Sequence, residues 1–129
     1  MIKFKHDKDK QMFSMLHPAL IMIFADMAYY AQMHHNIDLV VTETITTPEI
    51  DKQMQRVSNA HAQGRALDIR TKNIDAYIVQ DIIKYINSKK DYERFKYLSN
   101  SGIKRLAYFH VGNAEHIHLA IGAQFAINY

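Results

Sequence analysis

The stretch Lys104-Arg-Leu-Ala-Tyr-Phe-His-Val-Gly-Asn-Ala-Glu-His-Ile-His-Leu-Ala-Ile121 decides the fold that we expect for this chain. Residues 104–111 and 116–121 predict two strands, and the Gly112-Asn113 pair between them favours the turn of an antiparallel hairpin. The second strand has apolar side chains at every other position, which we expect to face the core: Ile117, Leu119 and Ile121. The side chains between them then face away from the core: His116, His118 and Ala120.

A second alternating segment covers residues 65–70. Leu67 and Ile69 are expected on its core face. The opposite face then carries Ala66, Asp68 and Arg70. The two periodicities therefore place Asp68 and His118 on the same solvent side of one sheet.

The remaining elements are helices and one further strand. His17-Pro18 begins an amphipathic helix whose apolar residues recur at helical spacing: Leu20, Ile23, Phe24, Met27 and Ala31. Residues 38–45 predict a strand, and the polar segment 46–60 predicts a loop with a helical turn. Asn73 is expected to cap a second helix that ends at 88–90, with one apolar face: Ile74, Tyr77, Ile78, Ile82, Tyr85 and Ile86. This order predicts an α+β fold, a small, mainly antiparallel sheet with helices on one face.

Composition limits the chain to one domain and excludes several classes of function. The chain has 129 residues, 48% of them hydrophobic, and no Pro/Gly/Ser-rich linker, so we expect a single domain spanning 1–129. The net charge is +3 and the isoelectric point about 9.1, but the basic residues are scattered, so we expect no nucleic-acid partner. The absence of cysteine excludes disulfides, thiolate nucleophiles and cysteine-type zinc sites.

Neither a secretory signal nor a membrane anchor is expected. Residues 1–10 are polar and charged where a signal peptide needs an apolar stretch, and the longest apolar run, 19–25, is too short to span a bilayer. We therefore expect a protein synthesised in the cytoplasm, without a membrane anchor, and monomeric.

Two short segments about fifty residues apart carry the chemistry that we expect. His61, Asp68 and His118 offer two imidazoles and a carboxylate, and a catalytic zinc usually takes three such ligands and leaves a position for water. Gly64 permits the turn that would bring His61 to Asp68. Glu115 is then the candidate base that deprotonates the water, provided that it sits in the turn region or at a bulge.

His116 is the alternative within this set. It shares the face of His118, so it could replace His118 as the ligand or stabilise the oxyanion of a transition state. Four other histidines are expected to be ordinary surface or core residues: His6, His17, His34 and His35.

The pattern His61-x-x-Gly64-x-Ala66-x-Asp68 followed by Glu115-x-x-His118 resembles the signature of the M15-type zinc peptidases. That family includes D-Ala-D-Ala carboxypeptidases and phage L-alanyl-D-glutamate endopeptidase endolysins, and it shares the fold of the Hedgehog signalling domain. The resemblance implies that zinc is held by His61, Asp68 and His118 and that Glu115 is the general base.

The chain departs from the family pattern at three places. Asn59 stands where the family commonly has serine, and His116 stands where it commonly has tryptophan. The family's arginine, which helps to polarise the scissile carbonyl, is missing, because its segment appears here as 43–48 with Thr46 in it. Other side chains could supply that role: Arg56, Arg65, Arg70 or His116.

These features predict a zinc peptidase that cuts the peptide stems of peptidoglycan. It would act at the bacterial cell wall as a phage endolysin released through a holin or as a virion-associated hydrolase. The alternative is a catalytically inactive zinc-binding structural or wall-binding module with the same fold. A zinc nucleobase deaminase is excluded because its His-x-Glu and Pro-Cys-x-x-Cys elements are lacking.

Overall fold

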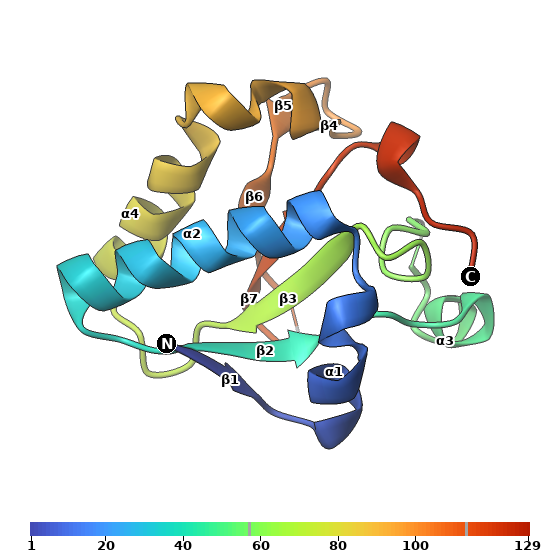
Figure 1. Cartoon of the computed structure of the whole chain (residues 1–129), viewed down its shortest axis with the longest axis horizontal. Helices are drawn as coiled ribbons and strands as arrows, with labels where there is room; N and C mark the ends of the chain where they lie inside the picture. The colour runs from blue at the N-terminus through green and yellow to red at the C-terminus, as the bar shows by residue number, and fades with distance from the viewer. Residues whose placement is uncertain (57, 113) are drawn as a thin grey trace.

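Strand β3 (Ala66–Arg70) lies at the centre of the sheet in the computed structural model, which describes residues 1–56, 58–112 and 114–129. The five-stranded sheet has the order β1-β2-β3-β7-β6 (Figure 1). Its other strands are β1 (Ile2–Phe4), β2 (Leu39–Glu43), β6 (Ala107–His110) and β7 (His116–Ala120). The pairings are antiparallel except that of β1 with β2, so the sheet is mixed and mainly antiparallel, in a small α+β domain.

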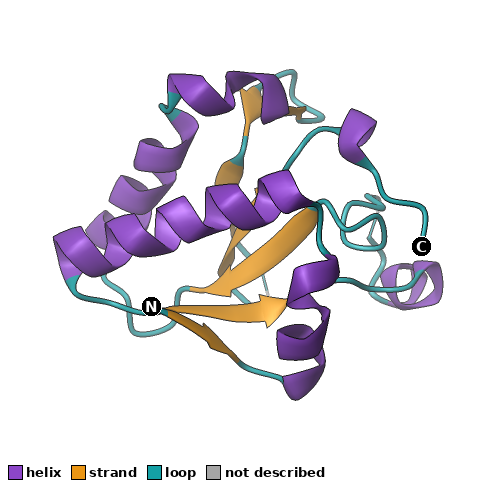
Figure 2. Cartoon of the chain, viewed as in Figure 1, coloured by secondary structure: helices purple, strands orange, loops and turns teal. Residues whose placement is uncertain are grey.

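Two long helices cover one face of this sheet. They are α2 (Pro18–His35) and α4 (Ala76–Asn87). In Figure 2, α2 crosses in front of the strands and α4 lies to their left. Leu67 and Ile69 of β3 are fully buried against them, as are Ile117 and Leu119 of β7. The core face expected for both strands is therefore confirmed, and the α+β prediction with helices on one face agrees with the observed layers. The solvent side predicted for Asp68 is wrong, because Asp68 is buried, as are Ala66 and Ala120 on the same face.

Shorter elements complete the chain. The α-helices are α1 (Asp7–Met12) and α3 (Pro48–Gln53), and a separate two-stranded sheet pairs β4 (Tyr97–Leu98) with β5 (Lys104–Arg105). The 3₁₀ turns are η1 (Phe13–Met15), η2 (Lys90–Phe95) and η3 (Ala123–Phe125). Helix α3 is the helical turn expected within 46–60. Within the described residues, no helix is long and apolar enough to cross a membrane.

Register brings the candidate residues side by side. Asp68 of β3 pairs with His118 of β7, and Arg70 pairs with His116. On the other side of β7, Tyr108 pairs with His118 and His110 with His116. The sheet face away from α2 and α4 therefore carries a row of histidine and tyrosine side chains around one carboxylate.

The second helix begins later than the sequence predicts. Asn73 has a left-handed backbone with φ of 67°, and Asp75 caps α4 in its place. Asparagine is common at helix N-caps and also in the left-handed region, because its short polar side chain can bond the local backbone. The sequence alone therefore does not decide between the two positions for Asn73. The predicted apolar face is also wrong at Tyr77, which is 69% exposed, whereas Val79 is buried.

The predicted strand 104–111 is interrupted. It divides into β5 and β6 at Leu106, because the Asn87 side chain bonds the backbone N–H groups of Leu106 and Ala107 and the carbonyl of Ala107. The predicted strands 38–45 and 116–121 are shorter, at Leu39–Glu43 and His116–Ala120. Asn113 of the predicted Gly112-Asn113 turn lies outside the described residues.

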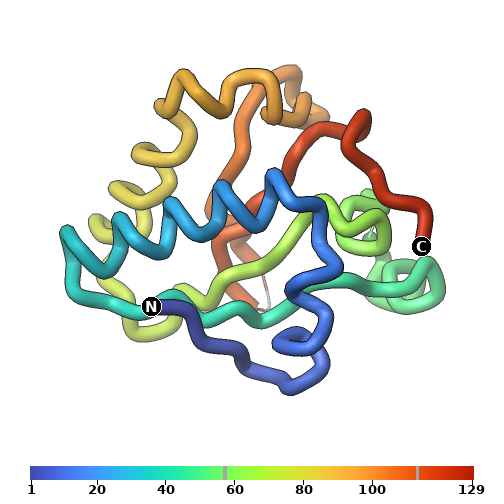
Figure 3. Tube along the Cα trace, in the orientation of Figure 1, coloured from blue at the N-terminus to red at the C-terminus, as the bar shows by residue number. Residues whose placement is uncertain are grey.

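The C-terminal segment runs beside the loop that precedes β3 (Figure 3). The Ile127 N–H donates to the carbonyl of Gln63, and the Tyr129 hydroxyl donates to the carbonyl of Met15. From the other side, the His17 N–H donates to the carbonyl of Gly64. The turn around Gly64 is therefore held by both the start of α2 and the end of the chain.

Candidate metal centre

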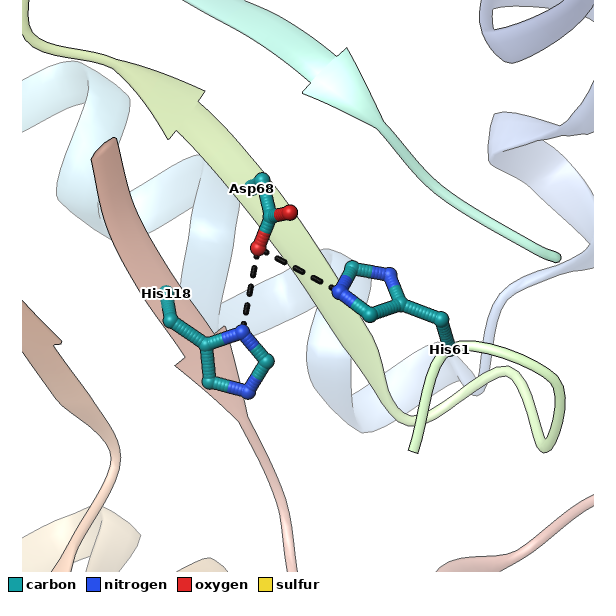
Figure 4. Close-up of side chains that lie close together, drawn as sticks. All are labelled: His61, Asp68 and His118. Atoms are coloured by element: carbon teal, nitrogen blue, oxygen red, sulfur yellow. Dashed lines mark hydrogen bonds and ion pairs between the residues drawn. The ribbon is translucent and has the colours of Figure 1, made fainter. Parts of the chain in front are cut away.

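Asp68 is the centre of a cluster of imidazoles on the sheet face away from α2 and α4. It is only 4% exposed, and its Oδ1 lies 3.0 Å from His118 Nδ1 and 3.3 Å from His61 Nε2 (Figure 4). One ligand atom from each of these three residues lies within 4.8 Å of the others. The group could therefore hold a metal ion, and its three members are those that the sequence singles out.

His61 reaches the cluster from the loop between α3 and β3. A turn returns the chain at Gly64, where the N–H donates to the carbonyl of His61 and φ is 68°. A left-handed residue of this kind favours glycine, so the expected role of Gly64 agrees with the geometry. His61 Nδ1 donates to the Thr44 carbonyl at 2.8 Å, which turns Nε2 toward Asp68.

His116 brings a third imidazole to the same carboxylate. Its Nε2 lies 3.4 Å from Asp68 Oδ1, while its Nδ1 donates to the Ala114 carbonyl at 2.7 Å. The His110 ring stacks on His116 with 4.8 Å between the centroids and 21° between the planes. The sequence-based expectation that His116 shares the face of His118 agrees with this position.

The donor set fits a cation. His61 and His116 each donate a hydrogen bond from Nδ1 to a backbone carbonyl, so in each ring it is Nε2 that faces Asp68. Such a contact is favourable only if Nε2 carries a second proton or if a positive ion is shared by the nitrogen and the carboxylate. Imidazole and carboxylate are ligands common to zinc and several other divalent metals.

Burial and mutual contact set the protonation of the cluster. Burial would raise the pKa of Asp68, but hydrogen bonds with His118 and His61 outweigh it and hold that pKa well below its usual range. Burial lowers the pKa of His118. Burial also opposes charge on His61, yet its contact with Asp68 prevails and raises its pKa. An ionised carboxylate beside a neutral imidazole suits a metal, because metal ligands bind in these deprotonated forms.

Arg56 lies next to this cluster, in a network that contains Thr46. Its guanidinium forms an ion pair with Glu43 and another, at 3.1 Å, with Asp51. The hydrogen bond to Glu43 is the main reason that the pKa of Arg56 is raised, and the charge of Asp68 adds to it. Thr46, which stands in place of the family's arginine, donates to Asp51 at 2.8 Å.

The other candidates for the arginine's role are placed differently. Arg70 lies on β3 opposite His116. Asn59, the candidate that stands in place of the family's serine, is exposed two residues before His61. Arg65 donates instead to the carbonyl of Ile121 and to the Gln63 side chain, and within the described contacts it does not reach Asp68. Arg56 and Arg70 are therefore the cations that share the surroundings of the cluster.

Glu115 lies apart from the cluster. It is exposed, immediately precedes β7, and lines a small pocket with Val79 and Phe109 on the side that α4 covers. Ile117, two residues further on, is buried in the core on that same side. No contact among the described residues brings its carboxylate to Asp68. The role of Glu115 as a base stays a prediction.

Two tyrosines beside His118 are absent from the sequence-based site. The Tyr108 ring lies 5.3 Å from the His118 ring and the Tyr97 ring lies 6.4 Å from it, centroid to centroid. Tyr97 also packs on three buried alanines, Ala60, Ala66 and Ala120. Alternation along the hairpin could have indicated Tyr108, whereas Tyr97 comes from the separate β4–β5 sheet, whose position the local pattern does not specify.

Comparison of the chain with family models, curated proteins and solved structures finds no match. The resemblance to the M15-type peptidases therefore rests on the two-part motif alone. The function has to be argued from the metal centre and the side chains around it.

Proposed function

We propose that this protein is a zinc-dependent peptidase that hydrolyses an amide bond in the peptide stem of peptidoglycan. The observation that carries the proposal is the convergence of His61, Asp68 and His118, the three ligands of the motif, from a loop and two strands. The mainly antiparallel sheet, with helices on the opposite face, is also consistent with a Hedgehog/DD-peptidase-like fold. We propose action at the bacterial wall as a phage endolysin or a virion-associated hydrolase.

Bound zinc would lower the pKa of a water molecule and polarise a carbonyl. Among the residues of the chain, Glu115 is the proposed base that takes the proton and returns it to the leaving nitrogen. For this, the turn before β7 would have to bring Glu115 across to the face of Asp68. His116 Nε2, already 3.4 Å from Asp68 Oδ1, is the proposed donor to the developing oxyanion. For this, His116 would have to carry a proton on both nitrogens, because its Nδ1 donates to the Ala114 carbonyl.

The same geometry favours one second candidate, a zinc-binding module without catalysis. If His116 is a fourth protein ligand, the ion is closed off, as in structural zinc sites. The exposed position of Glu115 on the α4 side favours this candidate too. The two candidates differ in whether the fourth position belongs to His116 or to a water molecule.

The test is digestion of purified peptidoglycan by zinc-loaded protein, analysed by mass spectrometry beside a sample treated with EDTA. New amino termini at D-Glu would identify an L-Ala-D-Glu endopeptidase, and released D-Ala a carboxypeptidase. Glu115→Gln should abolish turnover and retain zinc, whereas Glu49→Gln, on the exposed side of α3, serves as a matched control. Zinc binding without products from several wall types would support the non-catalytic module.

A further inference from the structure

Arg105 is held in a fixed position by two tyrosines. Its Nε donates to the Tyr97 hydroxyl at 3.0 Å, and its guanidinium carbon lies 4.1 Å from the centre of the Tyr108 ring. No ion pair among the described residues includes Arg105. A guanidinium has five donors, so most of those of Arg105 are left for a ligand.

Both tyrosines connect Arg105 to the metal centre. Tyr108 and Tyr97 contact the His118 ring, with 5.3 Å and 6.4 Å between the ring centres. Tyr108 is the register partner of His118, so Arg105 is separated from a metal ligand by a single aromatic ring. Tyr97 is fixed in turn by its packing on Ala66 and Ala120.

Arg105 and Tyr108 also line a cavity of about 430 Å³ between the free edge of β6 and α4, which contributes Gln80, Ile83 and Asn87. Lys96 and Lys104 line the same cavity, and none of its lining residues is acidic. Lys96 pairs with Glu93 at 2.7 Å, which leaves Lys104 and Arg105 as the cations without a described acidic partner. A concave site with cations and no carboxylate attracts an anionic group.

We propose that Arg105 binds a carboxylate of the substrate and thereby selects acidic peptide stems. The planar fork of a guanidinium matches a carboxylate with two parallel hydrogen bonds, and its stacking on Tyr108 presets that fork. The inference rests on the proposed function for its choice of ligand, because stem peptides carry free carboxylates on D-Glu and on terminal D-Ala.

The test is isothermal titration calorimetry of the zinc-loaded protein with two matched pairs of product fragments. One pair is γ-D-glutamyl-L-lysine and the same dipeptide with its D-glutamyl α-carboxylate converted to an amide. The other pair is acetyl-D-alanine and its amide. We expect the acid of at least one pair to bind about tenfold or more tightly than the amide, as a hydrogen-bonded charge implies. Arg105→Gln should remove that preference, and Arg105→Lys should retain only part of it.

Lys104→Gln is the matched control, because it removes a charge from the same cavity and should leave the preference intact. Zinc content and thermal unfolding of each variant verify that the fold and the metal centre persist. A preference that survives Arg105→Gln, or no preference for either acid, would overturn the inference.

The outcomes separate this inference from the proposed function. If peptidoglycan is not cleaved but the preference for the acid depends on Arg105, the carboxylate site stands and the peptidase proposal fails. If peptidoglycan is cleaved and Arg105→Gln changes neither the preference nor KM, the peptidase proposal stands and the role of Arg105 fails.

Discussion

Replacing Gly64 by alanine should destabilise the turn that presents His61. Gly64 has φ of 68°, and a side chain in this region costs about 1–2 kcal/mol. An added Cβ would lie 2.9 Å from Cζ of Tyr129 and closer still to its hydroxyl, so the ring must move. The hydrogen bond that the Tyr129 hydroxyl donates to the Met15 carbonyl, worth about 1 kcal/mol, would then be lost. We expect the free energy of unfolding to fall by about 2–3 kcal/mol.

Urea unfolding in EDTA measures this loss without a contribution from the metal. Tyr129→Ala in combination with Gly64→Ala separates the two causes, because without the ring only the backbone cost of about 1–2 kcal/mol remains. Competition with a chromophoric chelator should show zinc affinity about tenfold weaker in Gly64→Ala, since the turn orients His61. Unchanged stability and unchanged zinc affinity in Gly64→Ala would refute the reasoning.

Three further predictions concern His116, Asp26 and Tyr92. His116→Gln should keep the zinc affinity within about tenfold and lower kcat by about 10²–10³. A zinc affinity weakened beyond about 100-fold, measured by chelator competition, would instead make His116 a ligand. Burial raises the pKa of Asp26, but hydrogen bonds from Tyr85 and Tyr92 prevail and lower it. The stabilisation by Asp26 should therefore be lost as pH falls below about 4, and the urea midpoint of Asp26→Asn should fall less steeply over that pH range than that of the original protein. Burial and the hydrogen bond to Asp26 raise the pKa of Tyr92 to about 12. The stabilisation by Tyr92 should therefore hold below pH about 10 and disappear toward pH 12. At neutral pH, Tyr92→Phe should lower the free energy of unfolding, measured with urea, by about 1–2 kcal/mol.

Alternation explains why the face that carries the candidate metal ligands could be predicted. The two-residue period of a strand depends only on the backbone, so Leu67 and Ile69 could be assigned to the core and Asp68 to the opposite face. The same argument placed His118 beside Asp68 once the two strands paired. His61 required only that Gly64 reverse the chain.

Several features that were predicted wrongly or missed are set by residues distant in sequence. The strand 104–111 breaks because Asn87 of α4 bonds the backbone at Leu106 and Ala107. Strand β1 has three residues and depends on its pairing with β2, so no local period reveals it. The positions of Tyr97 and Arg105 likewise depend on how the small β4–β5 sheet packs against the large one.

The charges around the metal centre are distributed unevenly, and this bears on how a substrate would lie. On the β2 side, the cation Arg56 is shared by Glu43 and Asp51, so its charge is already neutralised and it is a weak substitute for the arginine of the M15-type peptidases. On the β5 side, Arg105 has no described acidic partner. Opposite signs on the two sides of Asp68 favour one orientation of a peptide, with its carboxylate toward Arg105 and the scissile bond over the metal. In the proposed peptidase, polarisation of the carbonyl then depends on His116 and the metal, because Arg56 is committed to its own carboxylates.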